Sequence, residues 1–510
     1  MSKRSAGSCN PSWVRFRVRN CDDGNFAGRL VEHLGEASCL TDAATGETVP
    51  ARDLSRLIVG FAIGFLSAGL KPDDRLLLCC GISPASTLAY LGAMYAGVVP
   101  VPTEERLLAT SGNSLLAQSQ AKAVWTAKAT NCDWAKTAGV RLFQGTFEPQ
   151  SPESLPPYSR AENDLAALMP TSGSTGAPRL VMVSHGNLRS NTEAIIRSQN
   201  LRSQYLGTAE RAMLIMPISY CFGASVMHTH LYQGGGVVFD SRFMFPDKVL
   251  HAINTYGCTT FAGVPIIYNI LLRRSNLRSI PLPGLRRFLQ AGGALDPESI
   301  WEMCEIVPTA EFLVMYGQTE ATARISCLPA ARLRDKLGSA GVPLDNLEVR
   351  IADEEGRELL PGQTGEIQVR GPSVCCGYLD DPESTERKFG GGWLKTGDFA
   401  CRDEDGYLWI KGRTDDFIKI RGVRVSVGEV ETRVAAIAGV SECAAVGVKH
   451  PEAGEALALV LVADSSPDGL CERVRREIPP HWTCVSIKIV PELPRTANGK
   501  IARTKLSALL

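Results

Sequence analysis

Short apolar runs alternate with helix-like stretches through the first two thirds of the chain. Residues 76–80 and 98–101 are apolar runs of strand length, and residues 84–95 between them have the composition of a helix. Two strands joined through a helix by short links predict a parallel βαβ unit, because parallel strands need a crossover of this kind. Residues 122–126 form a further apolar run, which we expect in the same sheet.

The order of strand, small or polar cluster, and helix recurs further along the chain. The expected strands are residues 164–170, 212–217, 234–239, 259–265, 287–290 and 312–316, and the expected helices are residues 187–198 and 266–273. In parallel α/β sheets the carboxyl ends of the strands form the ligand crevice. The polar clusters after four of these strands are therefore predicted to face one cleft.

From about residue 347 the hydrophobic period becomes two, which predicts a small antiparallel layer followed by a compact α+β tail. The expected fold class is α/β, with a large N-terminal domain of parallel sheets plus the antiparallel layer, and a small mobile α+β C-terminal domain. The strands of the layer are residues 347–351, 365–371, 393–398 and 406–410, and the two domains are residues 1–414 and 415–510.

Composition narrows the choice of partner and compartment. The 54 Lys and Arg residues balance 54 Asp and Glu residues, so no net charge favours nucleic acid or an anionic membrane. The 16 cysteines are scattered without CxxC pairs, which indicates a reducing compartment, and we expect a cytoplasmic protein. The pairs Cys79-Cys80 and Cys375-Cys376 are expected to be buried thiols. Residues 57–70 are too short to span a bilayer and predict a buried helix.

A run of small residues from Thr171 to Gly176 carries the first chemical signal. Glycines let backbone N–H groups converge on one anion, the Ser and Thr hydroxyls add donors, and Arg179 adds a fixed positive charge. No Gly-Lys-Ser/Thr closes the run, so it is not a Walker loop. Taken alone, it fits a flexible Ser/Gly turn equally well.

Eight short motifs in a fixed order give this loop its context. They are residues 171–176, 292–294, 316–320, 338–343, 365–366 with 377–378, 396–398, 412–413 and 494–500. Together they span almost the whole chain and resemble the adenylate-forming enzymes: acyl- and aryl-CoA synthetases, adenylation domains of non-ribosomal peptide synthetases, and luciferases.

The resemblance implies a two-step ligase. A carboxylate attacks the α-phosphate of ATP, giving an acyl-adenylate and pyrophosphate, and the acyl group then passes to a second nucleophile. Such a step needs positioning and charge neutralisation more than covalent help. The nucleophile is expected to be a thiol, on CoA or a carrier-protein pantetheine, while coronafacate-type ligases instead form an amide with an amino acid. A nucleotide-binding scaffold without catalysis is the alternative from a different class.

The resemblance also implies roles for individual residues. Lys500, Thr319 and Glu320 would be catalytic, with Glu320 holding Mg²⁺. Asp398 and Arg413 would bind the ribose hydroxyls. The full nucleotide-binding set is Thr171, Ser172, Gly173, Ser174, Thr175, Gly176, Arg179, Gly292, Gly293, Ala294, Tyr316, Gly317, Gln318, Asp398, Arg413 and Arg424. The small C-terminal domain would rotate between the two half-reactions about a hinge at Asp415.

Each assignment has a plainer alternative. Asp398 could be a turn cap, Glu320 a helix cap and Lys500 a solvated turn lysine. Tyr316 could be core packing. The motifs in register favour the functional interpretation.

The acid is predicted from the segment that follows Pro217. The resemblance implies that an amino-acid-activating domain would place an Asp near there to pair with the α-ammonium group, and residues 217–220 contain no acidic residue. An unpaired ammonium is costly to bury, so a standard amino acid is not expected as the acid. The residues expected to line the acid pocket are Tyr220, Phe222, Gly223, Phe261, Gly263 and Val264. They indicate an apolar organic acid, aliphatic or aromatic. Arg179 stands where the family usually has lysine, so pyrophosphate contacts are expected to differ.

Overall fold

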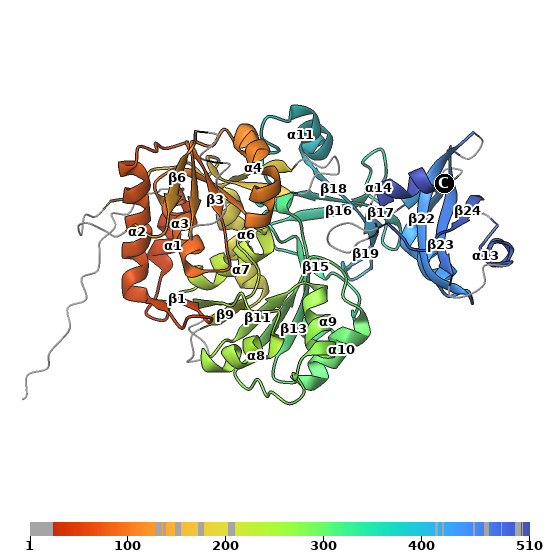
Figure 1. Cartoon of the computed structure of the whole chain (residues 1–510), viewed down its shortest axis with the longest axis horizontal. Helices are drawn as coiled ribbons and strands as arrows, with labels where there is room; N and C mark the ends of the chain where they lie inside the picture. Colours follow the sequence, from red (N-terminus) through yellow and green to blue (C-terminus); the bar gives the residue numbers. More distant parts are fainter. Residues whose placement is uncertain are drawn as a thin grey trace, which may run out of the picture. The chain divides into compact units, whose positions relative to one another are not determined.

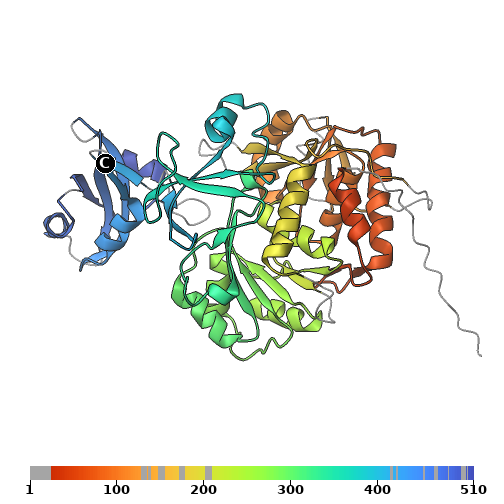
Figure 2. The same ribbon diagram turned by 180° about the vertical axis from the view of Figure 1, so that it is seen from behind.

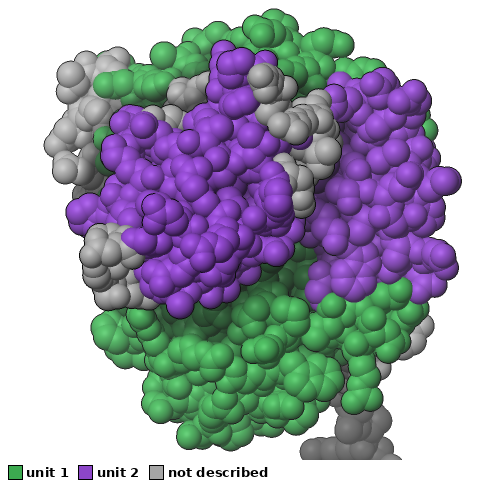
Figure 3. Space-filling view, turned by 90° about the vertical axis from the view of Figure 1, so that its right-hand side faces the viewer, with its two compact units in different colours: residues 1–337, 343–347, 370–392 green, residues 338–342, 348–369, 393–510 purple. Residues whose placement is uncertain are grey.

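The chain forms two compact units. The computed structural model describes residues 24–127, 135, 139–147, 155–171, 178–201, 210–413, 417–420, 423–451, 454–463, 469–480, 482–494, 501 and 503–510. The first unit contains residues 1–337, 343–347 and 370–392, and the second contains residues 338–342, 348–369 and 393–510 (Figure 3). Most of the antiparallel layer therefore belongs to the same compact unit as the C-terminal part of the chain. The predicted boundary after residue 414 and the hinge at Asp415, which lies outside the described residues, remain predictions.

A nine-stranded sheet forms the centre of the first unit (Figure 1). Strands β1, β10, β9, β11, β12 and β13 are parallel neighbours, while β2 and β14 pair antiparallel at either side. In sheet order the strands are β15 (Val342–Pro343), β14 (Ser326–Leu328), β13 (Glu311–Tyr316), β12 (Arg287–Gln290), β11 (Thr260–Gly263), β9 (Arg211–Leu214), β10 (Gly236–Phe239), β1 (Cys39–Asp42) and β2 (Thr48–Pro50). The predicted parallel sheet is confirmed.

Helices cover this sheet, and Figure 2 shows the same ribbon from behind. Helix α7 packs on β9 and β10, while α9 packs on β11 and α10 on β13. The helices of this part are α1 (Phe26–His33), α6 (His185–Ser198), α7 (Cys221–Tyr232), α8 (Pro246–Thr255), α9 (Pro265–Arg274) and α10 (Pro297–Ile306), with short 3-10 turns η2 (Thr319–Ala321) and η3 (Ala330–Arg332).

A second parallel sheet has the order β4-β3-β5-β6, as the βαβ pattern predicted. Its elements are α2 (Ala51–Ser67), β3 (Arg75–Cys79), α3 (Pro84–Tyr95), β4 (Val99–Thr103), α4 (Glu105–Ser119), β5 (Ala123–Thr126) and β6 (Arg141–Gln144). Ser83 caps α3 by accepting from the Ser86 amide, and Pro84 fits the first helical turn. Gly92 lets α3 approach α2 closely, since a Cβ there would collide with Phe61.

The strands that precede and follow residues 172–177 form an antiparallel pair, and here the prediction was incomplete. Strand β7 (Leu165–Thr171) was expected, but β8 (Arg179–Ser184) was not, and Thr171 lies opposite Arg179. The Leu-Val-Met-Val run of β8 has the composition of a strand, but its pairing with β7 depends on the tertiary structure and cannot be inferred from local sequence. Helix α6 begins after β8, where Ser184 and Asn187 form a capping box.

The second unit contains two sheets that are described separately. The antiparallel layer has the order β16-β17-β18-β19, and the C-terminal sheet has β21-β20-β23-β22 with β24 beside β23. Their elements are β16 (Glu348–Ala352), β17 (Thr364–Arg370), β18 (Leu394–Arg402), β19 (Leu408–Arg413), β20 (Phe417–Ile420), β21 (Val423–Ser426), α12 (Val427–Ala435), β22 (Val440–His450), β23 (Gly454–Ala463), α13 (Leu470–Glu477), β24 (Cys484–Ile489), α14 (Arg503–Leu506) and η6 (Ser507–Leu509). The predicted antiparallel layer and α+β tail are confirmed.

The adjacent cysteine pairs and the apolar helix α2 were two smaller predictions. Cys79, Cys80 and Cys375 are buried thiols as expected, but Cys376 is exposed, because it and Cys375 face opposite ways on an extended segment. Helix α2 is buried along one face, as residues 57–70 predicted. Within the described ranges, none of the helices is both long enough and apolar enough to cross a membrane.

Candidate active site

Thr319 and Glu320 lie on a tight reversal at the carboxyl end of β13. The chain turns through η2 and returns as β14, where the Ile325 amide donates to the Tyr316 carbonyl at 2.9 Å. The reversal uses left-handed backbone at Thr322, with φ of 55°, and a glycine at 317, where a Cβ would collide with the Ala323 carbonyl. This fixes two of the three predicted catalytic side chains at the expected edge of the sheet.

Tyr378 connects Glu320 to Arg179. Its hydroxyl donates to Glu320 Oε1 at 2.7 Å, and the Arg179 guanidinium carbon lies 5.4 Å from the centre of its ring. Burial and the Glu320 carboxylate raise the pKa of Tyr378. Tyr378 belongs to a motif that the sequence singled out, but no role was predicted for it.

Arg179 uses properties that lysine lacks. Its Nε lies 3.6 Å from Asp381, and its planar group stacks over Tyr378. Asp381 in turn accepts from the Ser384 amide at 3.0 Å and caps α11 (Pro382–Phe389), which precedes η4 (Gly390–Gly392). The guanidinium is therefore held in place beside the turn that carries Glu320.

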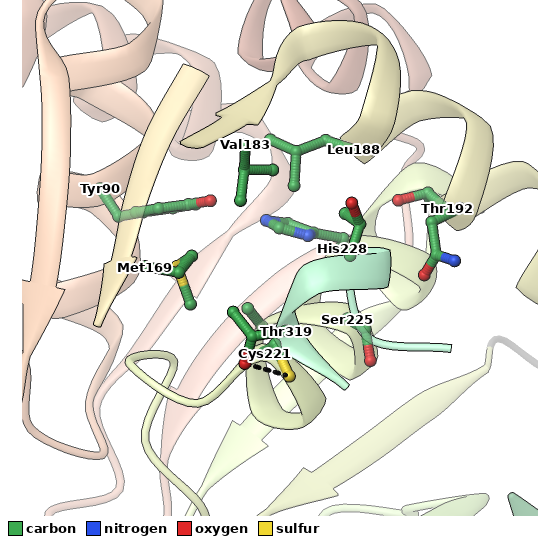
Figure 4. Close-up of a pocket in the computed structure, with 12 residues that line it drawn as sticks. Tyr90, Met169, Val183, Leu188, Thr192, Cys221, Ser225, His228 and Thr319 are labelled. Atoms are coloured by element: carbon green, nitrogen blue, oxygen red, sulfur yellow. Dashed lines mark hydrogen bonds between the residues drawn. The ribbon is translucent and has the colours of Figure 1, made fainter. Parts of the chain in front are cut away.

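Cys221, at the start of α7, contacts Thr319, whose hydroxyl lies 3.5 Å from the Cys221 sulfur. Figure 4 shows both side chains at the edge of a cavity, with the His228 ring pointing into it. The other lining residues are Tyr90, Met169, Val183, Leu188, Asn191, Thr192, Ala224, Ser225 and Thr322. Burial lowers the pKa of His228 to about 3, so the ring is neutral, and none of the described residues forms a hydrogen bond with its Nε2.

The predicted adenine loop, residues 292–294, follows β12 directly. Gly292 has φ of 82°, and a Cβ there would lie 3.0 Å from Val264, one of the predicted acid-pocket residues. The Gln290 side chain donates to the Gly293 carbonyl at 2.7 Å and fixes the loop. Gly292, Gly293 and Ala294 are exposed, so their backbone is open to a ligand.

The other predicted acid-pocket residues differ in exposure. Tyr220 is 56% exposed and Phe222 is half-buried, while Gly223 packs its backbone against the Pro217 carbonyl. Phe261 is fully buried and meets the Tyr268 ring edge-on. Phe261 therefore packs in the core of the unit, and its role toward the acid stays a prediction.

Asp398 and Arg413 pair across two antiparallel strands of the second unit. They lie directly opposite each other in β18 and β19, and Arg413 Nε is 3.5 Å from Asp398 Oδ1. The Asp398 side chain is 12% exposed, whereas that of Arg413 is 64% exposed. The Gly397 amide donates to Glu366 Oε1 at 2.9 Å, which fixes the turn before Asp398. The structure thus brings together the two residues predicted to bind ribose.

Several predicted residues cannot be placed. Ser172, Gly173, Ser174, Thr175, Gly176, Asp415 and Lys500 lie outside the described residues. Arg424 lies in β21 opposite Lys419. Tyr316, Gly317 and Gln318 are half-buried at the end of β13. Their roles remain predictions.

Comparison with known proteins decides the family. Residues 29–379 match the AMP-binding enzyme family, and residues 429–500 match the AMP-binding enzyme C-terminal domain. The chain belongs to the AMP-binding enzymes. The adenylate-forming resemblance drawn from the motifs is confirmed.

Other members of the AMP-binding family match the chain over nearly its full length. A feruloyl-CoA synthase from Amycolatopsis sp is 33% identical over 501 residues, which cover 95% of this chain and 98% of the relative. A 3-hydroxybenzoate–CoA ligase from Aromatoleum sp. (strain CIB) is 28% identical and covers 98% of each chain. The crystal structure of ATP-bound MatB from Rhodopseudomonas palustris superposes with a TM-score of 0.81 at 26% identity, covering 96% of this chain and 99% of that chain.

Sequence reasoning missed one charged residue near this AMP-binding site. Arg324 is 2% exposed, and its guanidinium carbon lies 5.8 Å from the centre of the Phe222 ring. Its place four residues after Glu320 was a weak signal, because an arginine after a turn is usually solvated. Only the tertiary structure reveals its burial.

Proposed function

We propose that this protein is an ATP-dependent acid–CoA ligase. In the first step a carboxylate oxygen attacks the α-phosphorus of ATP and the bond to pyrophosphate breaks, leaving an acyl-adenylate. In the second step the sulfur of CoA attacks the acyl carbon, AMP leaves, and the thiol proton passes to solvent. The relatives named above, which are acid–CoA ligases by name, support this assignment.

The observation that carries the proposal is the array of Arg179, Tyr378 and Glu320. One tyrosine contacts both a guanidinium, whose carbon lies 5.4 Å from the centre of its ring, and a carboxylate, which lies 2.7 Å from its hydroxyl. A cation that neutralises phosphate charge and a carboxylate that binds a metal are the two groups that a magnesium nucleotide needs. The array therefore suits polyphosphate binding next to Thr319.

The residues present fit Mg²⁺. Among the described side chains only Tyr378 donates to the Glu320 carboxylate, at Oε1, so Oε2 remains for a cation. The described part of the chain holds no group of three or more His, Cys, Asp or Glu side chains that could bind a metal, which agrees with the habit of Mg²⁺ of sharing one carboxylate with substrate phosphates. Bound there, the ion would neutralise charge on the phosphate oxygens.

The protein's own residues would then position the nucleotide. The Thr319 hydroxyl would donate to the α-phosphate, and the open backbone at Gly292 and Gly293 would lie against adenine. Asp398 would accept from ribose hydroxyls, with Arg413 as the second partner. Lys500 would reach the bridging oxygen region, as the resemblance implies.

The proposed function is tested by pyrophosphate release across a panel of aliphatic and aromatic acids, each with CoA, with mixed amino acids and with neither. Release that CoA increases, with an acyl-CoA product, is expected. Asp398→Asn should lower kcat/KM for ATP roughly ten- to hundredfold, since it weakens hydrogen bonds to a charged group. Asp353→Asn, in an exposed turn of the same sheet, is the matched control and should change little. Absence of release with every acid would overturn the assignment, and an amide product would favour an amino-acid ligase.

A further inference from the structure

Arg324 is a buried charge for which the described part of the chain supplies no counter-charge. It is 2% exposed, its Nη1 is buried without a hydrogen-bond partner, and no described residue forms an ion pair or hydrogen bond with its guanidinium. Its backbone is fixed on both sides by Asn191, which donates to the Arg324 carbonyl at 2.9 Å and accepts from its amide at 3.4 Å. Buried charges are normally paired, because an uncompensated one is expensive. The missing partner therefore calls for a ligand.

The surroundings of Arg324 reinforce its positive charge. Phe222, in the first turn of α7, lies under the guanidinium, and this helix has no acidic residue in its first turn and no side-chain cap from Tyr220. The positive end of a helix favours an anion. The two thiols that act electrostatically on Arg324, Cys327 and Cys221, have pKa values raised by burial, so they stay neutral. Burial also lowers the pKa of Arg324 to about 10, which leaves it charged at neutral pH.

Arg324 and Thr319 have Cys221 as a common neighbour. The Cys221 thiol interacts electrostatically with Arg324. The same thiol contacts Thr319, the residue expected to hold the α-phosphate. Asn191 and Cys221 both line the cavity in Figure 4. The next residue, Ile325, is hydrogen-bonded to the Tyr316 carbonyl at the end of β13. An acid whose carboxylate faced Thr319 could thus present a second group to this guanidinium.

We propose that Arg324 binds a second carboxylate on the acid, so that the substrate is a dicarboxylic acid activated at only one of its two ends. A neutral hydroxyl would hydrogen-bond the guanidinium but leave its charge uncompensated, whereas a carboxylate both accepts and neutralises. The reacting carboxylate is a poorer candidate, because it becomes the uncharged acyl group of a mixed anhydride in the acyl-adenylate, and a tight ion pair would weaken its attack. The proposal rests on the proposed function and changes the expectation of a wholly apolar acid.

The test compares dicarboxylates with their own monomethyl esters, which differ only in the distal charge. Suitable pairs are pimelate and isophthalate with their half-esters. Pyrophosphate release with ATP, Mg²⁺ and CoA is measured for the wild-type chain, Arg324→Met, Arg324→Lys and the control Arg332→Met. Arg332 is a partly exposed arginine in η3, eight residues further on.

The wild-type chain should prefer each dicarboxylate over its half-ester at least tenfold in kcat/KM, mainly through KM. Arg324→Met should abolish that preference, Arg324→Lys should retain part of it, and Arg332→Met should keep it all. A wild-type preference for the half-esters, or a loss in Arg324→Met that is equal for both members of a pair, would overturn the proposal. A marked fall in the melting temperature of Arg324→Met would do so too, because it would assign the arginine to the fold. If no acid supports release by the wild-type chain, the proposed function itself fails, which is a different result.

Discussion

The two edges of the nine-stranded sheet treat a buried arginine differently. At the amino ends of the parallel strands, Arg287 begins β12 and lies 2.8 Å from Glu210, which also accepts from the Thr259 hydroxyl at 2.6 Å. At the carboxyl edge, Arg324 is equally buried, yet no described carboxylate faces it. At the amino ends, Arg287 is paired with a carboxylate of the same chain. At the carboxyl ends, Arg324 remains available to an anionic ligand.

The difference indicates that charged residues at the amino ends of the strands stabilise the fold, whereas those at the carboxyl ends bind ligands. Burial acts to raise the pKa of Glu210, but Arg287 and the Thr259 hydroxyl have the larger combined effect and lower it. Glu210 and Arg287 therefore stay ionised and paired with each other. Parallel strands gather turns, glycines and helix ends at their carboxyl edge, where backbone geometry leaves room for ligands. Variants at the two edges should therefore change different measurements.

The largest effect is expected at the amino edge. Arg287→Met leaves Glu210 buried without its counter-charge, and breaking a buried pair in this way costs about 3–5 kcal/mol of unfolding free energy. Thermal denaturation should show a large drop in melting temperature. The double variant Arg287→Met with Glu210→Gln should recover part of it, because no charge is then left alone. A single variant as stable as the wild type would break the comparison.

At the carboxyl edge, Tyr378→Phe should slow catalysis and should lower stability less than Arg287→Met does. It removes a hydrogen bond to the Glu320 carboxylate, and bonds to charged groups contribute about 1.5–3 kcal/mol. We expect pyrophosphate formation to slow roughly ten- to hundredfold, with a raised Mg²⁺ requirement. Tyr407→Phe, a tyrosine of the antiparallel layer, serves as control. A Tyr378→Phe enzyme with normal Mg²⁺ dependence would contradict the role given to this array.

Acid should weaken the fold through two histidines of α7. Burial lowers the pKa of His228 to about 3 and of His230 to about 4, against 6.5 when unfolded. Above pH 6.5 neither state binds the proton, so stability is unaffected. Below it the unfolded chain gains protons that the folded one refuses, and each histidine costs about 2 kcal/mol by pH 5.

Denaturant unfolding between pH 7.5 and 5 measures this loss. The double variant His228→Gln with His230→Gln should make the profile less steep, because glutamine does not titrate, and the remaining loss should come from His185, whose pKa burial also lowers to about 4. A wild-type profile that is already flat over this range would show that the two rings are not buried as neutral groups.

The smallest effect should come from Arg324→Met in the absence of substrate. Replacing an unpaired buried charge with an apolar side chain of similar length removes a desolvation cost, so the melting temperature should stay level or rise. A dicarboxylate should then stabilise the wild-type chain more than the variant in the presence of ATP. If the dicarboxylate raised the melting temperature of the wild-type chain and of Arg324→Met equally, Arg324 would not differ from Arg287 in binding a ligand.

Much of the fold and part of the site were predictable from local patterns. The βαβ order, the period-two segments and the motifs at 316–320 and 396–398 are properties of neighbouring residues, because strand alternation and turn chemistry are local. The roles predicted for Thr319, Glu320 and Asp398 came from the resemblance of these motifs to adenylate-forming enzymes, and the structure places Thr319 and Glu320 at the expected strand end.

Other features depend on which distant segments meet. The sequence by itself determined the class of fold, the order of the motifs and the kind of residue at each predicted position. Only the tertiary structure decided that β8 pairs with β7, that Tyr378 reaches Glu320 across 58 residues, and that Arg324 is buried without a counter-charge. The physical reason is that burial and charge pairing depend on long-range packing, whereas periodicity and turn propensity are set by residues adjacent in the chain.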